Sequence, residues 1–408
     1  MIKTIKNILK NQLYPISLYS RQIAGTAVLL LITRMLSVYD YGLFRSYAAI
    51  VGFWLMFANL NYNDYILVSS KNVVREVQLK IGLFICNAIF IAVLIGFGGF
   101  FSSLESKFIF MLILLRSFFD GTFFGIMLPY YQASRKFNLI SWINIFYSIM
   151  TIVIAGISYI LHFSLVKFLV LSVMLGFFNF VQCSFYAKIN YFLVLNNLKK
   201  LLSQIDKSIF AYSGVSLCAY LYNQLPSLYA STMITKEEAA LYFSAASIAS
   251  IIGLLMFAQV QRIVPEMINA HVEKVKKIIK DSLRFILSIN GLIFIFFVIF
   301  GKILLKMLYG KVYYANAYPI LLILTFSNIS IAIAAIYGAY ITASGNQKMK
   351  IRMQIEAIGF TVVSLLLFYK LRIYAATIAY FLSATHIGLR YALVTKKLLD
   401  KYNCPNSS

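Results

Sequence analysis

Arg116 and Asp120 are opposite charges four residues apart within a long apolar stretch, LLRSFFDGTFFG. On a helix this spacing places both side chains on one face, where they can pair. At a rise of ~1.5 Å per residue, Asp120 is about 18 Å from the outer end of its stretch, near the middle of a bilayer. A charge at that depth is costly and is usually retained for a use, such as holding an anionic group or taking up a coupling ion. The alternative is a structural ion pair that locks helices together.

Other charged residues lie near the ends of apolar stretches. Arg34 is close to the outer end of the first stretch, from which its side chain could reach the outer interface. We expect Arg21 and Arg390, near inner ends, to extend to the interface in the same way. Glu356 follows Arg352 by four residues. It is a candidate ion-coupling carboxylate, although an ion pair with Arg352 on the helix surface is the favoured interpretation.

A weak internal repeat relates two parts of the chain. The segment DYGLFRSYAAI at 40–50 aligns without a gap on EAALYFSAASI at 238–248. The same offset pairs Asp64 with Arg262, which predicts opposite charges at matching inner ends of two helices. We interpret this pair as a candidate latch for a cytoplasmic gate. The alternative is two unrelated residues at the interface.

The elements that must position these residues are membrane-spanning helices. The chain has 408 residues, of which 61% are hydrophobic and only 12% are charged, too few for a soluble particle of this size. Apolar runs of this length must be helices, because a helix satisfies its own backbone inside lipid. The twelve expected spans are 15–37, 44–68, 80–101, 108–130, 139–161, 164–186, 208–232, 239–263, 284–305, 317–343, 352–371 and 374–395.

The basic residues predict the orientation of these spans. The net charge is +24, and most of the 37 Lys and Arg residues fall in alternate gaps between the apolar runs. Basic loops remain in the cytoplasm, so both termini are expected there. The pattern therefore indicates a multi-pass protein of the bacterial inner membrane and argues against nucleic-acid binding as the reason for the charge.

The long segments between the apolar runs predict how the chain divides into bundles. We expect a six-helix bundle at 1–186, a cytoplasmic linker at 187–207, and a second six-helix bundle with a cytoplasmic tail at 208–408. A second long cytoplasmic segment, 266–284, has apolar residues at helical spacing and lysines on other faces. It is either an amphipathic helix on the anionic inner membrane surface or an ordinary basic linker with some helical order.

Several stretches resemble the Wzx-like oligosaccharide flippases. They are TRMLSVYDYGLFRSYAAIVGF at 33–53, LPYYQASRKFNLIS at 128–141, EEAALYFSAASI at 237–248, MLYGKVYYANAYPILLIL at 307–324 and ASGNQKMK at 343–350. The resemblance covers most of the chain and rests on the ordered set rather than on one motif. It implies membership of the multidrug/oligosaccharidyl-lipid/polysaccharide (MOP) superfamily.

That resemblance implies two six-helix bundles around a central cavity that opens alternately to the two membrane faces. The implied substrate is an oligosaccharide repeat unit on polyprenyl pyrophosphate, moved to the outer leaflet for surface polysaccharide synthesis. Arg34 would face the cavity, and Arg116 could hold the pyrophosphate or an acidic sugar. The expected partners are this substrate, membrane lipids, and a polysaccharide polymerase with chain-length machinery. No cofactor beyond a coupling H⁺ or Na⁺, no metal site and no catalytic residue are expected.

Two other functions remain as alternatives. An ion-coupled multidrug antiporter of the same superfamily would favour a cavity rich in carboxylates, whereas the charges expected inside the spans lean basic. A membrane glycosyltransferase or polymerase acting on the same lipid carrier would need a catalytic group on a substantial external loop. The acidic residues of the expected outer gaps all lie in short turns.

Overall fold

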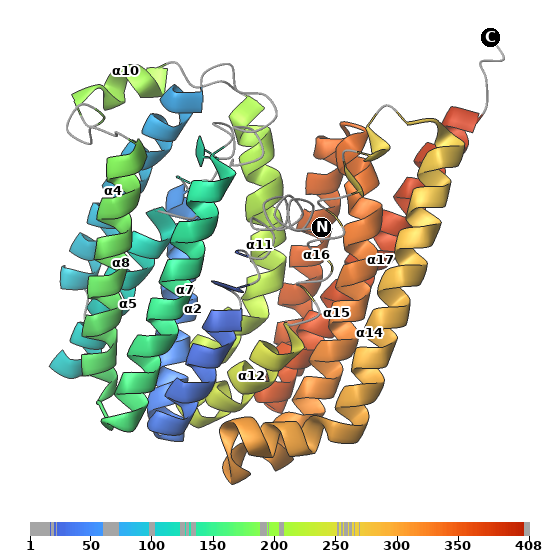
Figure 1. The fold of residues 1–408 in the computed structure, drawn as a ribbon. Helices are drawn as coiled ribbons and strands as arrows, with labels where there is room; N and C mark the ends of the chain where they lie inside the picture. The colour runs from blue at the N-terminus through green and yellow to red at the C-terminus, as the bar shows by residue number, and fades with distance from the viewer. Residues whose placement is uncertain are drawn as a thin grey trace, which may run out of the picture. The chain divides into compact units, whose positions relative to one another are not determined.

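The computed structural model describes most of the chain, and all regular secondary structure within the described residues is helical (Figure 1). The described residues are 17, 20–21, 23–59, 73–97, 103–122, 127, 130–131, 136–187, 194, 196–203, 208–250, 253, 256, 260, 263–264, 266–268 and 270–403. Contacts between residues divide the chain into two compact units, Met1–Leu217 and Cys218–Ser408. The division expected at 187–207 stays a prediction.

The first unit is a bundle of apolar helices. Within it α5 packs against α8 and α2, α7 packs against α8, and α2 packs against α4. The described elements are a first helix over Ile23–Met35, α2 Val38–Asn59, α4 Val73–Phe97, α5 Leu104–Thr122, α7 Phe137–Ile160, α8 Leu165–Ala187 and the short α10 Leu198–Ser203.

The second unit is built around α15, which packs against α12, α14 and α17, while α16 packs against α17. Helix α11 Ser208–Thr232 contains the boundary between the two units. The remaining elements are α12 Lys236–Ala249, α14 Val272–Tyr309, α15 Lys311–Ala343, α16 Gln347–Phe368, the 3₁₀ turn η2 Tyr369–Leu371 and α17 Ile373–Asn403.

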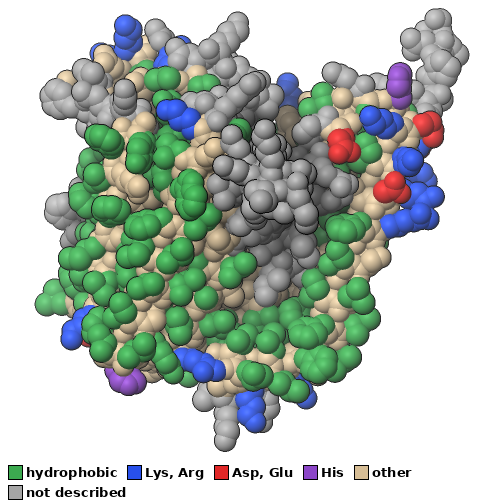
Figure 2. Space-filling view, viewed as in Figure 1, with side chains coloured by type: hydrophobic (Ala, Val, Ile, Leu, Met, Phe, Trp, Pro, Cys, Tyr) green, Lys and Arg blue, Asp and Glu red, His purple; other side chains and the backbone are tan. Residues whose placement is uncertain are grey.

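Each of the twelve expected spans overlaps a helix that the structure describes. Five described helices are long and apolar enough to cross a bilayer by length and composition: 137–160, 165–186, 272–309, 315–343 and 347–371. Helix α7 shows how such a helix meets lipid. Its exposed side includes Trp142 and Ile160, whereas its buried side includes Asn144 and Ser158. Hydrophobic side chains also cover much of the surface in view (Figure 2), as expected for an all-α multi-pass membrane protein.

The two copies of the internal repeat begin with the same local structure. The Ser37 hydroxyl accepts a hydrogen bond from the backbone N–H of Asp40 and donates one to its carboxylate. In the second copy Thr235 and Glu238 form a capping box at the start of α12. A short hydroxyl residue followed three positions later by an acid satisfies N–H groups that the first turn leaves open. Both copies therefore start their helix in the same way.

Helix α14 corrects the expectation for segment 266–284. The helix begins at Val272 and runs unbroken to Tyr309, so the amphipathic part continues directly into the membrane span. Val275 and Ile279 lie in a buried cluster with Ile336 of α15 and Leu399 of α17. The apolar face packs against these helices rather than lying on the membrane surface, because its helical spacing continues in register with the span.

Candidate functional site

Asp120 is the centre of a polar cluster in the first unit. The hydroxyl of Tyr147 on α7 donates a hydrogen bond to Asp120 Oδ1 over 2.5 Å. Arg116 Nε, one turn earlier on α5, is 3.9 Å from Asp120 Oδ2. Arg21 Nη2, from the first helical segment, is 3.7 Å from Asp120 Oδ1. Three helical segments therefore place donors around one carboxylate, and the expected pairing of Arg116 with Asp120 is present.

Arg21 corrects the expectation that its side chain extends to the interface. Its guanidinium carbon is 4.8 Å from the centroid of the Tyr147 ring, a cation–π contact, and its side chain is only 23% exposed. The counter-charge of Asp120 and the face of Tyr147 together hold the guanidinium among the helices. Arg21 is thus a member of the cluster.

Further polar groups lie on the same part of α7. Asn144 is fully buried, and neither polar atom of its side chain has a hydrogen-bond partner among the described residues. The Ser148 hydroxyl donates a hydrogen bond to the backbone carbonyl of Asn144 and lies 3.4 Å from the hydroxyl of Ser20. Asn144, Tyr147 and Ser148 follow each other at three- and four-residue spacing, so they share a helix face. Buried amides usually have partners, so Asn144 offers unused hydrogen-bonding capacity beside the cluster.

A gap too narrow to admit a water molecule adjoins the cluster. It is lined by Arg116, Tyr147, Thr151, Ile154, Ser172 and Leu175, from α5, α7 and α8. The Ser172 hydroxyl is buried and has no hydrogen-bond partner among the described residues. Arg116 Cζ is also 6.0 Å from the ring of Phe168. Arg116 therefore lies near both hydroxyl side chains and an aromatic ring.

Two guanidinium groups lie beside one carboxylate in this cluster. Arg21 and Arg116 are 3.7 and 3.9 Å from the carboxylate oxygens of Asp120. Guanidinium groups bind phosphate and carboxylate oxygens through paired N–H donors. A metal cation would instead meet the repulsion of two arginines. The cluster is therefore suited to an anionic ligand, and Asp120 is suited to holding both arginines in place.

The other expected site residues lie elsewhere. Arg34 is exposed in the last turn of the first helix, about 20 Å along that helix from Arg21 at ~1.5 Å per residue. It therefore does not belong to the cluster around Asp120. Asp64 and Arg262, the expected gate pair, lie outside the described residues. Among the described residues, no group of three His, Cys, Asp or Glu side chains is close enough to hold a metal ion.

Glu356 lies in a second ionic cluster, in the second unit. Arg390 of α17 binds it with two hydrogen bonds, Nε to Oε2 at 2.8 Å and Nη2 to Oε1 at 3.1 Å. Arg352 Nε is 3.7 Å from Oε1, which confirms the expected pair on the helix surface. His386 Nε2 is 4.0 Å from Oε2, and its ring stacks on Phe360. Arg390 thus links α16 to α17 instead of extending to the interface as expected.

Sequence reasoning left Tyr147 out of the site and misassigned Arg21. A signal for the α7 residues is present in the sequence. Ser141, Asn144, Ser148, Thr151 and Ser158 recur at helical spacing along an otherwise apolar segment, and all five are buried. A polar stripe inside an apolar span marks the face that turns away from lipid. No comparable local signal identifies Arg21 as the partner of Asp120.

Comparison with known proteins defines the fold class. No family model matches this chain, and no curated protein matches it. Among solved structures, MATE in complex with MaL6 is similar, with a TM-score of 0.66 and 12% identity over 96% of this chain and 94% of that chain. The inward-facing conformation of a multidrug resistance MATE family transporter of the MOP superfamily has a TM-score of 0.62 at 12% identity, over 94% and 95% of the two chains. An outward-facing conformation has a TM-score of 0.57 at 12% identity, over 95% and 94%.

This chain therefore has the fold of the MATE transporters of the MOP superfamily. The superfamily is the one implied by the sequence resemblance. One fold supports many activities, so the ligand must be argued from this chain's own residues.

Proposed function

We propose that this protein is an alternating-access transporter that moves a polyprenyl-pyrophosphate-linked oligosaccharide repeat unit from the cytoplasmic to the outer leaflet. The observation that carries the proposal is the pair of arginines sharing one aspartate at 3.7 and 3.9 Å. Two guanidinium groups close together among membrane helices are stabilised when an anionic group binds them, and a pyrophosphate is a strong partner for such a site.

The transport mechanism is supported by the fold. Similar structures of MATE transporters have been solved in inward-facing and outward-facing conformations. A binding site that opens alternately to the two faces would let the anionic head of the substrate cross without meeting the hydrocarbon core.

We assign the residues as follows. Arg116 and Arg21 bind the anionic head, and Asp120 with Tyr147 positions both guanidinium groups. Arg34, about 20 Å farther along its helix at ~1.5 Å per residue, would contact another part of a long substrate. Asp120 remains the coupling candidate of this unit. Glu356, held by Arg390, serves as a structural ion pair.

A second candidate function is an ion-coupled multidrug antiporter. The observation that favours it is the fold itself, because the similar solved structures include multidrug resistance transporters. The charge of the cluster favours the flippase, since a cationic drug would be repelled by the two guanidinium groups. Location in the bacterial inner membrane, and cooperation with a polysaccharide polymerase and chain-length machinery, follow from the flippase proposal.

The test is a genetic complementation in the native host lacking this gene and redundant flippases. We expect lipid-linked repeat units to accumulate in the cytoplasmic leaflet and surface glycan to fall. The wild-type gene should reverse both effects. Arg116→Gln and Arg21→Gln should each reduce recovery by roughly tenfold, the effect of losing about 1.4 kcal/mol of binding.

Arg352→Gln is the matched control, because Arg352 also lies 3.7 Å from its carboxylate partner but its side chain is 84% exposed. It should restore surface glycan to the wild-type level when the amount of inserted protein is equal. Normal surface glycan in the deletion strain would contradict the flippase. If the deletion strain instead became sensitive to cationic drugs while its glycan stayed normal, the antiporter would replace it.

A further inference from the structure

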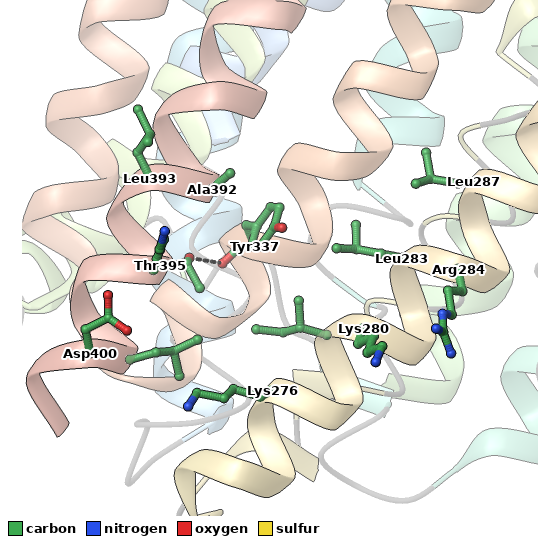
Figure 3. A pocket seen from close by; sticks show the side chains of 13 residues that line it. Lys276, Lys280, Leu283, Arg284, Leu287, Tyr337, Ala392, Leu393, Thr395 and Asp400 are labelled. Atoms are coloured by element: carbon green, nitrogen blue, oxygen red, sulfur yellow. Dashed lines mark hydrogen bonds between the residues drawn. The ribbon is translucent and has the colours of Figure 1, made fainter. Parts of the chain in front are cut away.

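A groove in the second unit has no role in the proposed transport. It runs between α14 and α17, with Tyr337 of α15 at its back, and has a volume of about 650 Å³ (Figure 3). The Thr395 hydroxyl on α17 donates a hydrogen bond to the Tyr337 carbonyl over 3.2 Å, which ties α17 to α15 at this point. The volume lies in the range typical of small-molecule sites.

The inner surface of the groove is apolar. Ile279 and Leu283 of α14 and Leu399 of α17 contribute to it, and Ile279 and Leu399 belong to the buried core of this unit. Leu287 is 42% exposed and Leu393 is 55% exposed, so the groove opens to the surface through apolar side chains. Both residues fall just inside the expected spans 284–305 and 374–395, so the opening lies at the boundary between acyl chains and headgroups.

The rim of the groove is basic. Lys276, Lys280 and Arg284 of α14 and Lys396 of α17 line it, against the single carboxylate of Asp400. Lys276 also pairs with Glu273 at 2.9 Å, whose side chain is 80% exposed. Lys and Arg side chains gather over this end of α14 in the space-filling view, with several Asp and Glu side chains among them (Figure 2). The groove therefore offers positive charge to a ligand.

The charge and the apolar surface are arranged along the groove. Lys276 and Lys280 lie toward the start of α14 and Lys396 toward the end of α17, whereas Leu287 and Leu393 lie toward the middles of these helices. The lining of α14 from residue 276 to 287 covers about 16 Å at ~1.5 Å per residue. The charge-sorted topology places the basic end at the cytoplasmic interface, where anionic lipid headgroups lie. This polarity matches a molecule with an anionic head and apolar tails.

We infer that this groove binds an anionic glycerophospholipid of the inner leaflet. The phosphate lies among Lys280, Arg284 and Lys396, and the acyl chains follow Leu283 and Leu287 toward the membrane interior. A free phosphate would leave the apolar surface unused, and an uncharged lipid would leave the basic rim without a partner. The inference is independent of the substrate that the first unit carries.

Lipid binding can be measured by native mass spectrometry of the detergent-purified full chain titrated with phosphatidylglycerol or phosphatidylcholine. We expect phosphatidylglycerol to be retained at lower concentration. Lys280→Gln combined with Lys396→Gln should weaken its binding about 25-fold, since each basic residue near lipid contributes about a factor of five. Ala392→Trp, which fills the groove and changes no charge, should weaken binding of the same lipid.

Lys277→Gln combined with Lys397→Gln is the matched control. It removes the same charge from the same two helices, but both lysines are exposed and neither lines the groove. Equal weakening by both double variants would show general attraction to the basic surface and overturn the site. Equal binding of the two lipids, or no effect of Ala392→Trp in a protein with wild-type melting temperature, would also overturn it. Displacement of phosphatidylglycerol by a lower concentration of polyprenyl phosphate would assign the groove to the carrier lipid instead.

Discussion

Tyr147 provides the shortest contact to Asp120, and it does so from a different helix than either arginine. Its ring also lies against Arg21. The phenol thus acts twice, as a hydrogen-bond donor to the carboxylate and as an aromatic surface for the cation. Without the hydroxyl, Asp120 would keep its ionic partners but lose the contact that sets its orientation.

We therefore predict that Tyr147→Phe disturbs the orientation of the Asp120 carboxylate and leaves the charges of the cluster unchanged. The variant keeps the ring beside Arg21 and loses one hydrogen bond, so its free energy of unfolding should fall by about 0.6–1.5 kcal/mol. Its melting temperature in detergent should therefore fall only slightly. Transport should fall several-fold, because both guanidinium groups depend on the position of Asp120. Tyr159→Phe, on the same helix but 37% exposed, is the control and should transport normally. Wild-type transport by Tyr147→Phe would exclude an orienting role.

Helices α15 and α17 approach each other closely at a glycine. A Cβ atom added at Gly388 would lie 3.1 Å from the backbone oxygen of Ser330. A backbone atom cannot move aside as a flexible side chain can, so a methyl group here must separate the two helices. Small residues commonly permit such close packing between membrane helices. Of the two helices that meet here, α17 lines the groove and α15 contributes Tyr337 to it.

Gly388→Ala should therefore destabilise the protein by about 1–3 kcal/mol, the usual effect of overpacking. Gly359→Ala on α16 is the matched control, because no atom lies within 4 Å of its added Cβ. That change should be neutral or stabilising by up to about 1 kcal/mol, since alanine favours a helix. The melting temperatures of the two purified variants test this comparison. If both changed stability equally, close packing at Gly388 would not contribute.

At the scale of the whole chain, the distribution of basic residues predicts the orientation of the helices in the bilayer. Basic residues concentrate in alternate gaps between apolar helices, and this alternation predicts which loops remain in the cytoplasm. It predicts that the basic end of α14 lies in the cytoplasm and the turn between α7 and α8 outside. The lipid inferred for the groove requires this orientation, because anionic lipids attract basic residues at the inner surface.

Single cysteines in a cysteine-free background test the orientation in intact cells. Ser164→Cys, exposed in the turn before α8, should react with a membrane-impermeant maleimide added outside. Lys274→Cys, exposed near the start of α14, should react only after the membrane is permeabilised. Labelling of Lys274→Cys in intact cells would invert the topology.

Hydropathy and charge alone predicted the helices, because the apolar runs and their ends are local properties of the chain. Each expected span overlaps a described helix, and the pair of Arg116 and Asp120 followed from spacing on one helix. Contacts between helices required the three-dimensional structure. Arg21 joins Asp120, Arg390 joins Glu356, and the start of α14 packs against its neighbours instead of lying on the membrane. Such contacts depend on how each helix is rotated and which helix lies beside it, and periodicity along one segment carries neither piece of information.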